Sequence, residues 1–286
     1  MGNETRILGI DFTSAPTARK PITCAVASFD GRRLKLIELA RWQSFAEFES
    51  ALAEPGLWVA GMDFPFGQSR RFVENIGWPH HWNGYVQEVA ALDRKGFRQA
   101  LEDYKEKRAA GDKHHRRACD RLSQSQSPQT LYGTPVGLMF FEGAPRLLQA
   151  GVHLPFHHDG DQSRVVLEAY PGLAARSLIG KRSYKSDSKG KQTDEHREAR
   201  ADIWTRLTGA EGRAMYGFSV DAPKNLINDP GADDLDALLC AVQAAWGWSH
   251  REQNFAAPQE LDRLEGWITD PALTVGDGHK RTLRGS

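Results

Sequence analysis

The pattern of apolar and polar positions predicts strands in the first and last parts of the chain. Apolar runs of strand length occupy residues 6–11, 22–29, 57–62 and 164–170. Such short apolar runs are typical of strands that are buried in a sheet. Residues 34–39 supply a strand that returns from the Asp30-Gly31 turn, which we expect to be of type I′. The order of these elements predicts an antiparallel meander followed by a strand parallel to the first.

Helical spacing dominates the middle of the chain. Ser44 and Glu47 form a capping box, which predicts a short helix from 45 to about 53. Between the strands, apolar residues recur at helical spacing, with an expected break at Gly96 and a new start at Thr134-Pro135. We therefore divide the chain into a first core half at 1–67, a helical insertion at 68–163, a second core half at 164–270 and a flexible basic tail at 271–286.

The most apolar predicted helix begins near residue 233 and has a polar start. Its body to residue 246 is almost wholly apolar, so we expect it to be buried against the sheet. Asp233 and Asp236 are three residues apart and share one face of the first turn, whereas Asp234 points elsewhere. Taken alone, this pattern favours a structural role for the acids, in which they cap the N-terminus of the helix and interact favourably with its dipole.

Three predicted strands end on an acidic residue. Asp11 closes the first strand, Asp63 follows the fourth, and Glu168 lies near the end of the run at 164–170. Neighbouring strands are about 4.8 Å apart, so acids at the same ends of adjacent strands lie close together. A buried carboxylate has to be paired, hydrogen-bonded or bound to a metal. By itself, Asp11 is equally well explained as the start of an Asx turn.

Five short motifs, taken together in this order, carry a family resemblance. They are Gly9-Ile10-Asp11, Met62-Asp63-Phe64-Pro65, Leu167-Glu168-Ala169-Tyr170-Pro171, Asp233-Asp234-Leu235-Asp236-Ala237-Leu238 and Glu265-Gly266-Trp267-Ile268. The set resembles an uncharacterised family of predicted RNase H-like nucleases and extends over nearly the whole chain. The resemblance implies an α/β protein with a ribonuclease H-like mixed sheet flanked by helices. RuvC-type resolvases share that fold and carry an Asp-x-x-Asp pair followed by alanine, which Asp233, Asp236 and Ala237 match.

The resemblance also implies a metal-dependent active site. Its expected catalytic and metal-binding residues are Asp11, Asp63, Glu168, Asp236 and Asp233. Two carboxylates about 5 Å apart repel by roughly 3 kcal/mol at an effective dielectric of about 20, so a compensating cation is expected. Oxygen ligands favour Mg²⁺ or Mn²⁺ over zinc. Two such ions would support hydrolysis of phosphodiester bonds by a two-metal-ion mechanism.

One acid of the ribonuclease H pattern has no clear counterpart. Those enzymes take an acid from the helix after the third strand, where Glu47 and Glu49 lie in this chain. Capping already explains Glu47, and Glu168 is the alternative fourth ligand. The identity of that ligand is therefore open.

Basic segments predict a nucleic-acid partner, either DNA or RNA. Residues 93–121 carry ten Lys/Arg against six Asp/Glu, and residues 176–191 carry six against one. Either segment is a solvated face or a track for phosphates. The expected substrate-binding residues are Tyr184, which would stack on a base, Lys185, Arg197, Thr13 and Ser14. We expect Asp221 to lie in a loop near the site.

Two other functions remain open. Residues 9–14 also resemble the first phosphate loop of actin-like ATPases and sugar kinases, which would make the protein an ATP-dependent phosphotransferase. No second glycine-rich phosphate loop stands out in the sequence. The third possibility is a catalytically inert module that binds nucleic acid through its basic segments.

Cysteine and histidine patterns favour neither disulfides nor a zinc site. The three cysteines are far apart, which indicates reduced thiols in a cytoplasmic protein. His153 and His157 are four residues apart, but Pro155 between them opposes a helix, so we expect an ordinary loop. The 37 basic and 37 acidic residues balance, and no apolar run is long enough to span a membrane.

Overall fold

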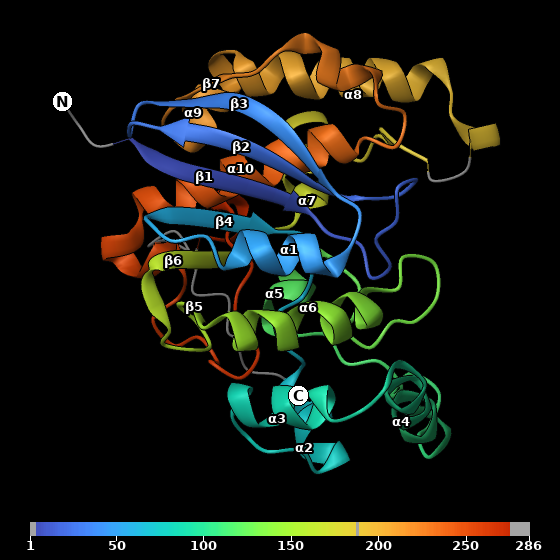
Figure 1. Cartoon of the computed structure of the whole chain (residues 1–286). Coiled ribbons are helices and arrows are strands. Elements are labelled where there is room, and N and C mark those ends of the chain that lie inside the picture. The colour runs from blue at the N-terminus through green and yellow to red at the C-terminus, as the bar shows by residue number, and fades with distance from the viewer. Residues whose placement is uncertain (1–3, 187–188, 275–286) are drawn as a thin grey trace.

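The computed structural model describes residues 4–186 and 189–274 as a seven-stranded mixed sheet with helices on both faces (Figure 1). The order of the strands across the sheet is β5-β6-β4-β1-β2-β3-β7. Their bounds are β1 Thr5–Asp11, β2 Ile22–Phe29, β3 Arg33–Trp42, β4 Trp58–Met62, β5 Val152–His153, β6 Asp161–Glu168 and β7 Ser219–Asp221. The α/β class and the predicted mixed sheet are confirmed, and the arrangement is consistent with a ribonuclease H-like fold.

Strand pairing places β1 at the centre of the sheet. β1 is antiparallel to β2 and parallel to β4, and β4 is in turn parallel to β6. β2 and β3 complete the predicted meander. The carboxyl ends of β1, β4 and β6 therefore meet at one edge of the sheet, which is where the sequence places their terminal acids.

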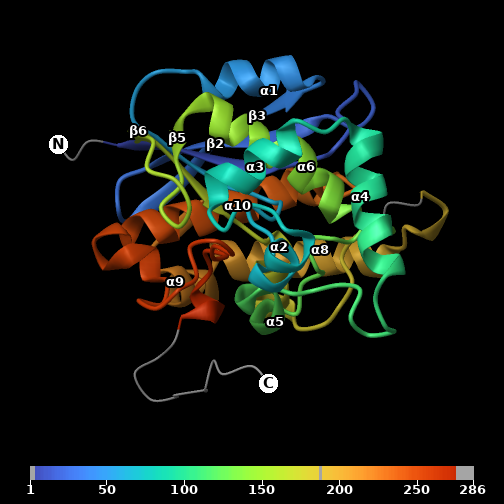
Figure 2. The same cartoon turned by 90° about the horizontal axis from the view of Figure 1, so that it is seen from below.

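The helices form two layers (Figures 1 and 2). The first layer contains α1 Phe45–Leu52, α2 Arg70–Ile76, α3 Trp82–Ala90, α4 Arg94–Glu106 and α6 Val136–Ala150. The short helix α5 Ala118–Ser123 lies apart from this layer, and its Cys119 packs in a third cluster with Leu173 and Trp267. The second contains α7 Pro171–Ile179, α8 Asp194–Thr208, α9 Ala210–Tyr216 and α10 Asp233–Ser249. Short 3-10 segments lie at Lys189–Lys191, Lys224–Asn228, Arg251–Ala256 and Pro271–Leu273.

The pleat of the sheet separates two hydrophobic cores. Ile7 of β1 and Val59 of β4 belong to the core beneath α7–α10, whereas Ile10 and Met62 belong to the core beneath α1 and the insertion. Successive side chains of a strand point to opposite faces, which explains this division. The same alternation decides which face of the sheet each terminal acid occupies.

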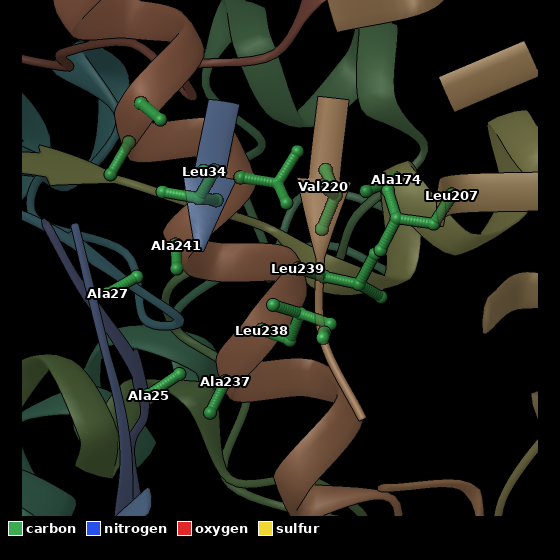
Figure 3. Close-up of a cluster of buried hydrophobic side chains, with 14 of the residues drawn as sticks. Ala25, Ala27, Leu34, Ala174, Leu207, Val220, Ala237, Leu238, Leu239 and Ala241 are labelled. Atoms are coloured by element: carbon green, nitrogen blue, oxygen red, sulfur yellow. The ribbon is translucent and has the colours of Figure 1, made fainter. Parts of the chain in front are cut away.

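Helix α10 packs directly on the central strands. Figure 3 shows Ala237 and Ala241 on the side of α10 that faces the strands carrying Ala25 and Ala27. A Cβ atom at Gly9 would lie 2.0 Å from the carbonyl oxygen of Ala237, and one at Gly61 would lie 2.3 Å from that of Cys240. Glycines in β1 and β4 thus permit the close approach of the helix backbone.

Several local expectations are wrong in detail. Gly96 lies inside α4, and the break precedes it, because the Asp93 side chain caps the helix by accepting a bond from the Gly96 N–H at 2.6 Å. The Asp30-Gly31 turn is not of type I′, since only Gly31 has a positive φ. Asp30 instead accepts bonds from the N–H groups of Arg32 and Arg33, both at 2.8 Å.

The expected position of Asp221 is also wrong. Asp221 belongs to β7, an edge strand parallel to β3, and forms an ion pair with Arg33 at the opposite end of the sheet from Asp11. The hydrophobic pattern missed β7 because this strand has only three residues. The equally short β5 was missed for the same reason.

Parts of the predicted basic segments lie outside the described residues. This applies to residues 275–286 of the expected tail and to residues 187–188 of the basic loop. No helix within residues 4–186 and 189–274 has the length and apolarity needed to cross a membrane. The three cysteines are buried free thiols, in agreement with the expected absence of disulfides among them.

The close packing of α10 on β1 generates a stability prediction. Gly9→Ala should lower the free energy of unfolding by about 1–3 kcal/mol or more, because the added methyl group meets backbone atoms that have no room to move aside. Urea denaturation measures this loss. Gly190→Ala is the matched control, since a Cβ there has no neighbour within 4 Å. Equal stability of the two variants would contradict the packing described.

Candidate active site

Asp11 and Asp63 leave adjacent parallel strands at the same edge of the sheet. Ile10 pairs with Met62 in register, and the Asp63 N–H donates a bond to the Ile10 carbonyl oxygen at 3.0 Å. Asp11 has the same strand parity as Ile7, and Asp63 has the same parity as Val59. Both carboxylates are therefore directed to the face of the sheet that α10 covers.

The first turn of α10 adds two more carboxylates. Asp236 is fully buried, and its N–H closes the first turn of the helix on the Ala232 carbonyl oxygen at 2.8 Å. Asp233 lies three residues before it, on the same side of the helix. Asp234 is directed elsewhere, as the spacing predicted, and its carboxylate forms an ion pair with Arg41 of β3. We call Asp11, Asp63, Asp233 and Asp236 the acidic group.

The segment before α8 supplies a cation to the acidic group. Lys185 forms an ion pair with Asp236, and the Tyr184 hydroxyl donates a bond to the other oxygen of that carboxylate at 2.7 Å. The Lys185 side chain remains 37% exposed. Arg200 of α8 fixes this segment by donating a bond to the Tyr184 carbonyl oxygen at 2.8 Å. In the described part of the chain, no other lysine or arginine makes an ion pair with the acidic group.

Burial makes ionisation of the acidic group unfavourable. Burial raises the pKa of Asp11 well above its usual range, and the charge of Asp236 adds to this effect while Lys185 opposes it. Burial likewise raises the pKa of Asp63 to about 7, against the opposing charge of Lys185. The pKa of Asp233 is raised by burial and then by Asp229. The pKa values of these acids are thus raised even though the charge of Lys185 opposes the shift.

Glu168 makes a different set of contacts from the other predicted acids. Its two oxygens accept bonds from both terminal nitrogens of Arg117, at 2.6 and 2.7 Å, and one also accepts the Phe66 N–H at 2.9 Å. Arg117 is 1% exposed and also pairs with Asp120. Burial raises the pKa of Glu168 despite the opposing charge of Arg117. Glu168 thus has an arginine partner, which it shares with Asp120, although its charge still raises the pKa of Asp63. Of the five predicted acids, the other four lack such a pairing with any arginine that the structure describes.

Strand register explains the position of Glu168. Glu168 pairs with Met62, whose side chain lies in the core on the insertion side of the sheet. Glu168 thus begins on the opposite face from Asp63 and meets Arg117, which precedes α5 of the insertion. Sequence reasoning missed Arg117, and the alternation along β6 gave a signal only for the face of the sheet on which Glu168 lies. Val165 and Leu167 face α10, so Glu168 faces the other way.

A cavity of about 290 Å³ lies at this edge of the sheet. Asp63, Glu168 and Lys185 contribute polar groups to its wall, and Val136 and Met139 of α6 contribute apolar ones. The insertion therefore forms one side of the site. Asp236 does not line the cavity. Tyr184 and Lys185, which do line it, both contact the Asp236 carboxylate and separate it from the cavity.

The predicted substrate-binding residues have mixed positions. Lys185 and Tyr184 line the cavity, but Tyr184 is 8% exposed and its hydroxyl is bound to Asp236, so its ring is no open stacking surface. Ser14 is buried, and its carbonyl oxygen accepts a bond from Arg94 at 2.8 Å. Thr13 is partly buried, and Arg197 is exposed on α8. Neither of these two residues lines the cavity.

The other candidate ligands make ordinary structural contacts. The Glu47 carboxylate accepts the Gln43 N–H, and Glu49 accepts a bond from Arg146 at 2.8 Å. Ser44 caps α1, whereas Glu47 reaches one residue further back than the capping box predicts. His153 is hydrogen-bonded to Gln162 at 2.8 Å. His157 is hydrogen-bonded to the Arg263 carbonyl oxygen at 3.0 Å and lies against the Trp82 ring.

Across the described ranges, no three His, Cys, Asp or Glu side chains are arranged as a ready-made metal site. The acidic group nevertheless has the oxygen donors that hard divalent cations prefer. One of those oxygens, on Asp236, already forms an ion pair with the ammonium group of Lys185. Binding of an ion to Asp236 would therefore replace the ammonium group of Lys185.

The raised pKa of Asp63 predicts a pH dependence of stability without divalent ions. Because the folded protein holds the proton up to about pH 7 and the unfolded chain loses it near 3.8, stability falls as pH rises through this window, by up to about 4 kcal/mol. Asp63→Asn should remove that part of the slope. Denaturation between pH 4 and 8 in chelator measures it, and identical slopes for the two proteins would refute the assignment.

Comparison with known proteins places the chain in a family. No curated protein and no solved structure has significant similarity to it. A family model described as "Protein of unknown function (DUF429)" matches residues 9–260, a span that contains β1, the insertion and α10. The chain therefore belongs to the DUF429 family.

Proposed function

We propose that this protein is a metal-dependent nuclease that hydrolyses phosphodiester bonds of nucleic acid. Support comes first from the charge balance of the acidic group. Among the described residues, the four carboxylates, which end β1, follow β4 and begin α10, form an ion pair with one ammonium group, that of Lys185. Burial is the main cause of the elevated pKa values of Asp11 and Asp63, and the charge of Asp236 adds to both shifts while the charge of Lys185 opposes them. A divalent cation would supply further positive charge to the group.

The donor set supports Mg²⁺ or Mn²⁺ as the cofactor. Asp11, Asp63 and Asp236 would hold the ion, with Asp233 beside them, since all four offer only oxygen atoms. Glu168 is not included, because Arg117 occupies both of its oxygens. When bound, such ions polarise a phosphodiester and lower the pKa of a water molecule, which is the chemistry of hydrolysis. We propose two ions, following the ribonuclease H-like resemblance.

The residues of the chain have separate roles in this proposal. Lys185 stays charged, because burial is outweighed by Asp236, Tyr184 and Asp11, which raise its pKa. From the cavity wall, its ammonium group would bind a phosphate oxygen after release from Asp236. Val136 and Met139 on the facing wall would limit access of water. Arg117 holds Glu168 and the insertion against the sheet, which positions that wall.

A cleavage assay tests the proposal. The full-length protein is incubated with Mn²⁺ and labelled single-stranded, duplex and branched DNA or RNA. We expect cleavage by the wild type and a loss of more than about 100-fold in Asp11→Asn and Asp63→Asn, since even outer-shell partners of metal sites contribute about 10–100-fold. Asp221→Asn is the matched control, because this carboxylate pairs with Arg33 at the far end of the sheet.

Two results would contradict the nuclease. Cleavage that persists in Asp11→Asn would indicate a contaminating enzyme. Consumption of ATP without strand cleavage would instead favour the phosphotransferase to which residues 9–14 also show a resemblance. Melting curves establish that each variant is folded before its activity is compared with that of the wild type.

A further inference from the structure

The insertion carries a second, larger recess on its surface. Its volume is about 730 Å³, within the range of about 300–1,000 Å³ that ligand sites occupy. Its wall includes Arg71, Arg116, Arg121, His114, Tyr132 and Gln126. Gln126 also lines the cavity beside Asp63, so the two hollows adjoin each other. A long ligand in the recess would therefore extend toward the acidic group.

The recess has an excess of positive charge that the protein does not neutralise. Arg116 and Arg121 are exposed and form no ion pair within residues 4–186 and 189–274. Arg121 donates a bond to the Arg116 carbonyl oxygen at 2.7 Å, which fixes the position of its guanidinium. Both oxygens of Glu265, the acid in the wall, accept backbone N–H groups, from Arg70 and Ala118, at 2.9 Å. Both arginines thus remain available to an external anion.

An aromatic ring stands beside these arginines. Tyr132 is 69% exposed, the largest exposure among the large apolar or aromatic side chains on the described surface. His114 contacts it edge to face, with ring centroids 5.9 Å apart, and so restrains its orientation. The ring belongs to the loop between α5 and α6. An exposed ring can stack on a base, and the unpaired guanidinium groups beside it can bind a phosphate.

We propose that this recess binds a single-stranded segment of nucleic acid, with a phosphate on Arg116 and Arg121 and a neighbouring base stacked on Tyr132. The proposal rests on the proposed function, since it names the form of nucleic acid that the site takes and where the flanking strand lies. A single strand is favoured over a duplex because stacking on a side chain requires an unpaired base. In this proposal, Tyr132 of the recess has the base-stacking role that the sequence predicted for Tyr184.

The test is a binding measurement in chelator, which prevents metal-dependent cleavage. Fluorescence polarisation of a labelled single-stranded oligonucleotide is recorded with the full-length protein over a range of salt concentrations. Arg116→Ala/Arg121→Ala should weaken binding at least tenfold and reduce the salt slope by about 0.7, the contribution of the one phosphate that the two arginines no longer neutralise. Tyr132→Ala should weaken binding about fivefold or more, whereas Tyr132→Phe retains it.

A double variant elsewhere on the surface controls for the loss of charge. Arg98→Ala/Arg213→Ala removes two exposed arginines, on α4 and α9, that have no carboxylate partner in the described structure and lie outside the recess. It should bind like the wild type. If this control variant weakens binding as much as Arg116→Ala/Arg121→Ala does, the proposed binding in the recess is overturned, and the nucleic acid is held by non-specific electrostatic attraction.

The outcomes separate this proposal from that of the nuclease. Loss of binding in the recess variants supports the recess, even if the wild type cleaves nothing. Unchanged binding in those variants overturns it, even if the wild type cleaves nucleic acid at the acidic group. Tighter binding of duplex than of single strand, or no binding of either by the wild type, also overturns it.

Discussion

The direct packing of α10 on β1 and β4 is the constraint on which the site depends. Glycines at positions 9 and 61 let the backbone of the helix approach these two strands closely. The first turn of the helix consequently lies at the carboxyl ends of these strands, and Asp236 is buried with Asp11 and Asp63 nearby. The packing of α10 on the sheet thus also brings these three carboxylates close enough to repel one another. A fold that gathers carboxylates in this way requires positive charge in return.

The molecule supplies that charge in two different ways. On the insertion face, Arg117 binds Glu168 through two hydrogen bonds and is almost inaccessible to solvent. Such a buried pair is costly to break, so Glu168 has a structural role in joining the insertion to the sheet. On the α10 face, Lys185 compensates one carboxylate of four, and its side chain remains partly exposed. This second arrangement is the one that a divalent ion can replace.

The sequence predicted the central strands of the sheet and the directions of the acids in the first turn of α10, because both follow from local patterns. Apolar runs located β1, β4 and β6, and the spacing of Asp233 and Asp236 separated them from Asp234. It failed where a partner comes from a distant segment. Nothing near Glu168 indicates that Arg117, 51 residues earlier, would bind it. Likewise, the basic loop suggested that Tyr184 would be exposed, but Asp236 holds it in the interior.

Calorimetric titration of Mn²⁺ into chelator-treated protein tests the central claim most directly. The account predicts that the wild type binds Mn²⁺ and that Lys185→Met binds it about tenfold more tightly or better, because a unit charge about 5 Å away contributes on the order of 3 kcal/mol. Asp11→Asn, which has one oxygen ligand fewer, should bind weakly. Absence of binding by the wild type, or weaker binding by a folded Lys185→Met protein, would contradict the account.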